Sequence, residues 1–117
     1  IKSFQLEGDK KINRKIILSL NVKSQIKETG YKLLLDSNKT IETVSKNSAG
    51  DASAFRTLIT VNVSLLDSDK IFKTKTFTSN FTYNNIKNKY DLSQYQKDIE
   101  TNLINKIVEE IFIFLTL

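Results

Sequence analysis

The sequence predicts an α+β fold in which two helices pack on one face of a mainly antiparallel four-stranded sheet. Residues 55–66 and 71–83 alternate apolar and polar side chains, which is typical of antiparallel strands with one solvated face. From Asp91 onward the apolar period changes from two residues to about four, which indicates a long helix. The predicted order is β-α-β-β-β-α, and residues 1–117 form a single domain.

The first strand and the first helix are predicted at residues 2–7 and 10–27. The strand segment alternates weakly. Apolar residues then recur at every fourth position from Ile12 to Leu20 and define one face of a helix. Asp9 is placed to cap the first turn of this helix.

The next segments are short and extended. Residues 31–35 are predicted to form a buried strand, and residues 37–39 (Ser-Asn-Lys) have the composition of a turn. Residues 40–46 are rich in β-branched side chains, which favours a second strand or the far half of one long bent strand. Residues 47–53 are predicted to be a polar loop.

Residues 55–66 and 71–83 are predicted to pair as a hairpin around a tight turn at residues 67–69. The last helix is expected to begin near Asp91, with Asp91 or Ser93 as its N-cap. Its buried face is predicted from residues that recur every four positions: Tyr95, Ile99, Leu103, Ile107 and Ile111.

Composition limits the possible functions. The 117 residues include no Cys and no His, which removes disulfides, thiolate chemistry and the commonest general base and metal ligand. We therefore predict no enzyme activity, no cofactor and no metal. No apolar run approaches the roughly 20 residues of a membrane helix. The chain begins at Ile1, so we expect a longer precursor that carries any signal peptide or anchor upstream.

The formal charge of +5 suits phosphate-bearing partners, and basic residues gather in two places. Lys73 and Lys75 lie on the second hairpin strand, where alternation puts them on the side of Phe77, so a bulge or twist is expected to turn them toward water. Arg56 is expected near them on the neighbouring strand. These cations could hold phosphate groups, or the lysines could protect a sheet edge. The first helix is also basic, with Lys10, Lys11, Arg14, Lys15, Lys23 and Lys27.

The join between the last strand and the last helix, residues 81–92, carries a family resemblance. Tyr83 is followed by Asn84, then by Asn88, then by Tyr90 at the start of the helix. This pattern resembles the outer-membrane lipopolysaccharide-assembly lipoprotein family LptE, of the alphaproteobacterial type. The similarity extends to the opening Gly8-Asp9 with Ile12-Asn13-Arg14, and to the hairpin over residues 57–82.

This resemblance implies a non-catalytic lipoprotein on the periplasmic face of the outer membrane. Such a protein plugs and assists an LptD-type barrel and helps to deliver lipopolysaccharide. Two features depart from the family. The lipidated Cys is absent here, so the lipid anchor is expected upstream in the precursor. The Ala/Glu-rich last helix of the family is replaced by one rich in Lys, Asn and Ile. The expected lipopolysaccharide-binding residues are Lys73, Lys75 and Arg56.

The barrel partner is expected to contact polar loops at the ends of the sheet, because these loops contribute little to the core. The expected contact residues are Ser48, Gly50, Asp51, Asp67, Ser68 and Lys70. A second hypothesis is a double-stranded RNA-binding module, whose α-β-β-β-α order matches residues 9–115. Such modules carry a lysine cluster at the start of the last helix, which this sequence lacks, so no nucleic acid partner is expected.

Overall fold

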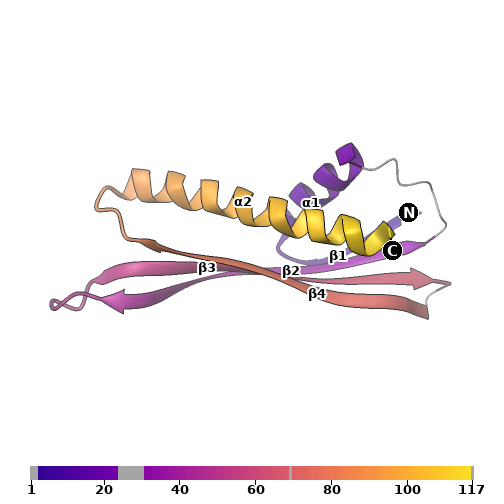
Figure 1. The fold of residues 1–117 in the computed structure, drawn as a ribbon, viewed down its shortest axis with the longest axis horizontal. Coiled ribbons are helices and arrows are strands. Elements are labelled where there is room, and N and C mark those ends of the chain that lie inside the picture. The colour runs from indigo at the N-terminus through magenta and orange to yellow at the C-terminus, as the bar shows by residue number, and fades with distance from the viewer. Residues whose placement is uncertain (1–2, 24–30, 69, 117) are drawn as a thin grey trace.

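The computed structural model describes residues 3–23, 31–68 and 70–116. It contains a four-stranded sheet in the order β1-β2-β3-β4, and Figure 1 shows both helices on one face of that sheet. Strand β1 is parallel to β2, and the other neighbouring pairs are antiparallel. The predicted fold class and element order are confirmed. The elements are β1 (Ser3–Gly8), α1 (Lys10–Lys23), β2 (Lys32–Lys46), β3 (Ala52–Asp67), β4 (Lys70–Asn84) and α2 (Lys89–Thr116).

The molecule is elongated, with extents of 56 × 24 × 22 Å, because β2, β3 and β4 are each 15 or 16 residues long. Strand β1 pairs only with residues 32–37 of β2. The remaining part of β2, residues 38–46, continues past β1 together with β3 and β4. We call this part of the sheet the three-stranded end. It lies beneath the first half of α2, whereas α1 covers the other part of the sheet (Figure 1).

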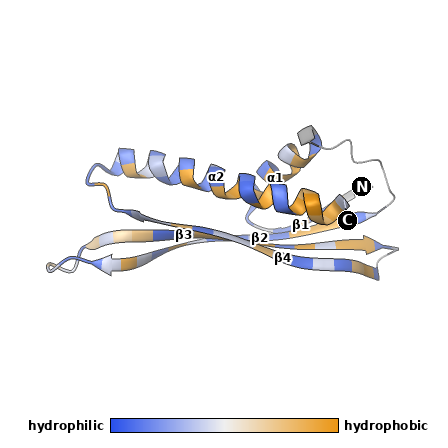
Figure 2. Ribbon diagram, in the orientation of Figure 1, coloured by the Kyte–Doolittle hydropathy of each residue, from blue (hydrophilic) through white to orange (hydrophobic). Residues whose placement is uncertain are grey.

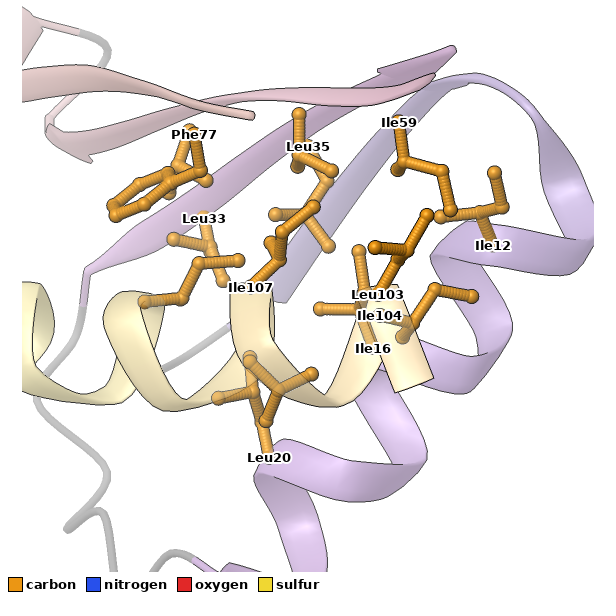
Figure 3. Close-up of a cluster of buried hydrophobic side chains, with 14 of the residues drawn as sticks. Ile12, Ile16, Leu20, Leu33, Leu35, Ile59, Phe77, Leu103, Ile104 and Ile107 are labelled. Atoms are coloured by element: carbon orange, nitrogen blue, oxygen red, sulfur yellow. The ribbon is translucent and has the colours of Figure 1, made fainter. Parts of the chain in front are cut away.

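The core lies between the helices and the covered face of the sheet, as Figure 3 shows. Both helices and all three long strands contribute to it, and Figure 2 shows the hydrophobic residues of α2 concentrated in its second half. Each buried aliphatic side chain contributes about 1.5–3 kcal/mol relative to exposure. The fully buried side chains include Ile12, Ile16, Leu33, Leu35, Ile59, Val61, Val63, Ile104, Ile107 and Ile111.

The predicted turn at residues 37–39 is wrong, because β2 runs through it without a break. Ser37 is 1% exposed, and its hydroxyl donates to Asn13 Oδ1 at 2.7 Å and lies 3.1 Å from the backbone oxygen of Asp9. The polar residue therefore holds β2 to the start of α1. Asp9 caps α1 as predicted, since its Oδ1 accepts from the Ile12 N–H at 2.9 Å. The predicted end of this helix near residue 27 lies outside the described residues.

Helix α2 begins at Lys89, two residues before the predicted start. Its N-cap is Asn88, whose Oδ1 accepts from the Tyr90 and Asp91 N–H groups at 2.9 and 3.1 Å. The prediction of Asp91 or Ser93 as the cap is therefore wrong. The predicted helix face is buried at Ile99, Leu103, Ile107 and Ile111, while Tyr95 is 37% exposed at its margin.

The hairpin turn is confirmed by the pairing of Asp67 with Lys70, which reverses the chain between β3 and β4. Ser68 has a positive φ of 51°, which the turn requires. Asp69, the third residue of the predicted turn, lies outside the described residues.

Candidate functional site

The sheet face opposite the helices is uncovered, and we call it the open face (Figure 1). Polar pairs join its strands: Ser64 and Thr74 hydroxyls lie 3.0 Å apart, and Thr76 Oγ1 donates to Asn62 Oδ1 at 2.6 Å. These pairs keep the strands in register where no helix packs on them. The open face therefore offers a hydroxyl-rich and amide-rich surface suited to hydrogen bonding with a partner.

Lys73 and Lys75 lie on the covered face rather than on the open face. A bulge is present, since Leu65 pairs with Lys73 and Leu66 pairs with Ile71, but it does not turn either lysine away from the helices. The Lys73 ammonium donates to the backbone oxygen of Phe114 at 2.7 Å. The expectation that both lysines turn from the helix side toward water is therefore wrong for Lys73, because α2 supplies an acceptor.

Lys75 is exposed but stays on the side of Phe77, with its Nζ 5.3 Å from the centroid of the Phe77 ring. A lysine stem that covers apolar surface while its ammonium reaches an aromatic face or water is a common arrangement. Of the two lysines, Lys75 is the one whose ammonium is placed for contact with an outside anion.

Arg56 does not lie near the two lysines. It pairs with Thr82 across β4, whereas Lys73 lies opposite Leu65, nine residues further along β3. At about 3.4 Å per residue, this separates Arg56 from Lys73 by roughly 30 Å. Arg56 Nη2 also forms a 2.8 Å ion pair with Glu42 Oε2. The expected cluster of three cations is therefore wrong: the antiparallel register sets Arg56 at the three-stranded end and Lys73 near the other end.

The predicted partner-contact residues are all exposed, and they lie at the ends of the sheet as expected. They form two separate groups, because β3 connects one loop to the other along its whole length. The first group is Ser48, Gly50 and Asp51, and the second is Asp67, Ser68 and Lys70. A partner that touches both groups must extend along the long axis of the molecule (Figure 1).

The loop of the first group is held by Asn47. Its Oδ1 accepts from the Ala49 and Asp51 N–H groups, each at 3.0 Å, and its own N–H donates to the Asp51 oxygen at 2.8 Å. Gly50 has a φ of +86°, which a glycine adopts without strain. The loop between β2 and β3 is therefore preformed, and it presents Ser48 to solvent at the tip of the three-stranded end.

The residues that carried the family resemblance fasten α2 to the sheet. Tyr83 is 5% exposed, and its hydroxyl lies 2.8 Å from Thr57 Oγ1 and accepts from Gln96 Nε2 at 3.0 Å. The Tyr83 ring also meets the Tyr95 ring edge to face, with centroids 5.7 Å apart. Together with the Asn88 cap, these contacts fix how the chain passes from β4 into α2.

A buried ion cluster was missed by the sequence-based prediction. Glu100 on α2 is 3% exposed, and its carboxylate meets lysines from α1 and β2. The Nζ–Oε distances are 3.0 Å for Lys39, 3.3 Å for Lys15 and 3.7 Å for Lys11. The available signal was a carboxylate on the apolar stripe of α2, directly beside Ile99.

Two opposing effects act on the pKa of Glu100. Burial raises it, whereas hydrogen bonding and charge attraction from Lys39, and then from Lys15, lower it. The lysines outweigh burial, so the pKa lies below the usual range of a glutamate. Glu100 is therefore an ionised carboxylate that draws the basic face of α1 and Lys39 of β2 onto α2.

The described residues give no sign of a metal site or a membrane-spanning helix. They contain no cluster of three or more carboxylates, histidines or cysteines that could bind a metal ion. None of the helices within residues 3–23, 31–68 and 70–116 is both long and apolar enough to cross a membrane. The main candidate features in the described part of the chain are the open face, the two loops at the ends of the sheet and the ion cluster around Glu100.

Several solved structures of bacterial lipoproteins share this fold. Rare lipoprotein B from Shewanella oneidensis superposes with a TM-score of 0.72 and 11% identity, over 97% of this chain and 93% of that one. A minor lipoprotein from Acinetobacter baumannii gives a TM-score of 0.68 and 14% identity, over 94% and 87% of the two chains. Lipoprotein B from Nitrosomonas europaea gives 0.67 and 9%, over 98% and 84%. No family model and no curated protein matches the sequence.

Proposed function

We propose that this chain is a non-catalytic lipoprotein subunit that assists lipopolysaccharide assembly on the periplasmic face of the outer membrane, together with an LptD-type barrel. The observation that carries the proposal is the agreement of fold along almost the whole chain with lipoprotein structures, reaching a TM-score of 0.72 over 97% of its residues. The proposal includes a lipid anchor on the precursor, upstream of this chain.

The sequence at the join between β4 and α2 supports the same proposal independently of the fold comparison. The sequence pattern at this join resembles the LptE family, and its residues have a physical role here: Tyr83 ties β4 to α2 and Asn88 caps α2. A double-stranded RNA module would need a lysine cluster at the start of the last helix. The first turn of α2 contains the single lysine Lys89 together with Asp91, which is no lysine cluster. We therefore do not propose RNA binding.

The elongated shape supports contact with a surrounding partner. A barrel that encloses the chain would meet the preformed loop with Ser48, Gly50 and Asp51, and the open face with its hydroxyl and amide groups. Asp67, Ser68 and Lys70 would contact it at the opposite end of the sheet. We assign the barrel contacts to these two loops and to the open face between them.

We also propose that the chain contacts lipopolysaccharide directly. Because Arg56 lies far from Lys73 and Lys75, these three cations would contact it at two separate places. Lys75 provides an exposed ammonium near one end of β4, and Lys73 lies beside it with its ammonium on Phe114. Arg56 would make a separate contact at the three-stranded end, where it already pairs with Glu42. Each exposed charge pair contributes only about 0–1 kcal/mol, so binding through these cations depends on several weak contacts.

Site-specific photo-crosslinking tests the partner assignment. The full-length precursor is co-expressed with the barrel protein of the same genome, with a crosslinking residue at Ser48, Asp51 or Ser68. All three positions should capture the barrel. Glu110, an exposed position on α2, is the matched control and should capture it much less. Capture from Glu110 alone would contradict the proposed orientation, and no capture from any position would contradict the partnership.

A further inference from the structure

The lysines around Glu100 outnumber the charge that they neutralise. One ammonium group balances one carboxylate, but Lys11, Lys15 and Lys39 all reach Glu100 within 3.7 Å. Lys11 and Lys15 approach the same oxygen, Oε2, so their ammonium groups lie within a Debye length of each other, about 8 Å at physiological ionic strength. Their mutual repulsion is not offset by any further acid among the lining residues of this cluster.

A cavity of about 160 Å³ opens beside this cluster, between α1, β2 and α2. Lys97 adds a fourth lysine, and its ammonium forms no ion pair within the described part of the chain. Lys11, Lys39 and Lys97 line the cavity, and Lys15 contacts Glu100 beside it. These four ammonium groups and one carboxylate leave an excess of three positive charges in and around the cavity. Ser93 also lines the cavity and carries a hydroxyl donor, whereas the Thr57 hydroxyl and the Gln96 amide already bond to Tyr83.

We propose that this cavity binds a tetrahedral oxyanion, namely a phosphate group, either as free phosphate or on a phosphorylated headgroup. Lysine ammonium groups bind phosphate as point charges, and charged hydrogen bonds are about twice as strong as neutral ones. The volume far exceeds the roughly 10–15 Å³ needed for one water molecule. The side chain of Lys11 is 60% exposed at the rim, so an anion has access from solvent.

Glu100 has a defined part in this site. Its buried carboxylate gathers Lys15 and Lys39 from two different elements and holds them in place before any anion arrives. Lys11 and Lys97 then supply the positive charge available to an anion. Lys11 is the most distant of the three paired lysines from Glu100, and Lys97 forms no ion pair among the described residues. The inference does not depend on the proposed function.

Calorimetric titration of the chain with inorganic phosphate tests this site. We expect saturable binding, weakened about tenfold in Lys97→Gln and in Lys11→Gln, because each loses one charge-assisted contact. Lys87→Gln is the matched control: it removes the same charge from the exposed connection between β4 and α2 and should bind phosphate like the wild type. Lys39 is left intact, because its loss would disturb the 3.0 Å pair with Glu100.

Absence of saturable binding would overturn the proposal, as would equal weakening in Lys87→Gln and Lys97→Gln, which would mean that only net charge matters. A second arm identifies the source of the phosphate group. Sedimentation with phosphatidylcholine vesicles is compared with and without phosphatidic acid. Vesicle binding that is lost in Lys97→Gln identifies a headgroup phosphate as the ligand. Phosphate binding without vesicle binding identifies free phosphate.

Discussion

The ammonium group of Lys73 donates a 2.7 Å hydrogen bond to the backbone oxygen of Phe114, in the last turn of α2. The same ammonium lies 4.8 Å from the centroid of the Phe114 ring. The last carbonyl groups of a helix lack partners within the helix and carry partial negative charge. A lysine of β4 therefore satisfies the end of α2 and fixes it to the sheet, 41 residues away in sequence.

Lys73→Met should lower the free energy of unfolding by about 1 kcal/mol, because it removes a charged hydrogen bond to a helix end but keeps the aliphatic stem. Lys75→Met is the matched control, since Lys75 is exposed and no hydrogen bond to it is seen among the described residues. Its effect should stay within about 0.5 kcal/mol. Urea unfolding measures both variants. Equal values for the two would mean that the Phe114 contact contributes nothing.

Glu100 should make stability depend on pH in the acidic range. Its folded pKa lies below the usual value because Lys39 and Lys15 outweigh burial. A depressed folded pKa gives stability that is fully present above the unfolded value, about 4.3, and is lost as pH falls through the folded pKa.

Glu100→Gln removes this contribution, so the gap in unfolding free energy between wild type and variant should narrow as the pH falls below about 4.3. Urea unfolding of both proteins from neutral to acidic pH measures the gap. Contributions from the rest of the chain are common to both proteins and cancel in the difference. Curves that stay parallel across this range would show that Glu100 is not held ionised by the lysines.

Gly8 should be far less replaceable than Gly50, although both have positive φ, at 82° and 86°. A Cβ at Gly8 would overlap the backbone oxygen of Ser37, whereas a Cβ at Gly50 would meet nothing within 4 Å. Gly50→Ala should cost about 1–2 kcal/mol from backbone strain alone. Gly8→Ala should cost more than about 3 kcal/mol, since strain and overlap act together. Comparable midpoints in urea would refute the close approach of Gly8 to β2.

Asn88→Ala should destabilise the protein by about 1 kcal/mol, because two N–H groups of the first turn of α2 lose their acceptor. Ser93→Ala serves as the control, since Ser93 lies within α2 and, among the described residues, the first N–H groups of the helix bond to Asn88 and not to Ser93. Thermal unfolding followed by circular dichroism compares the two. A larger loss in Ser93→Ala would restore the sequence-based assignment of the cap.

Periodicity predicted most of the fold. The alternation over residues 55–66 and 71–83 anticipated β3 and β4 because one sheet face is buried and the other is solvated. The prediction of a turn at residues 37–39 was wrong because a tertiary contact outweighed the local turn composition. Ser37 is buried against Asp9 and Asn13, residues that precede it by more than twenty positions.

The candidate site was less predictable than the fold, because it depends on register. Arg56 and Lys73 are both basic and both lie on neighbouring strands, but only the pairing of Arg56 with Thr82 shows that they are far apart. The oxyanion cavity depends on three elements that meet around Glu100, and local sequence does not record which lysines reach a given carboxylate. The preformed Asn47 loop was predicted only as a polar loop, since its hydrogen bonds follow from backbone geometry.

Depletion of the protein in its native cell, followed by quantification of lipopolysaccharide at the cell surface, tests the central claim most directly. A subunit of the assembly machinery should be required for lipopolysaccharide to reach the surface. We predict that surface lipopolysaccharide falls and accumulates inside the envelope, and that re-expression of the wild-type precursor restores it. Unchanged surface lipopolysaccharide after complete depletion would contradict the account.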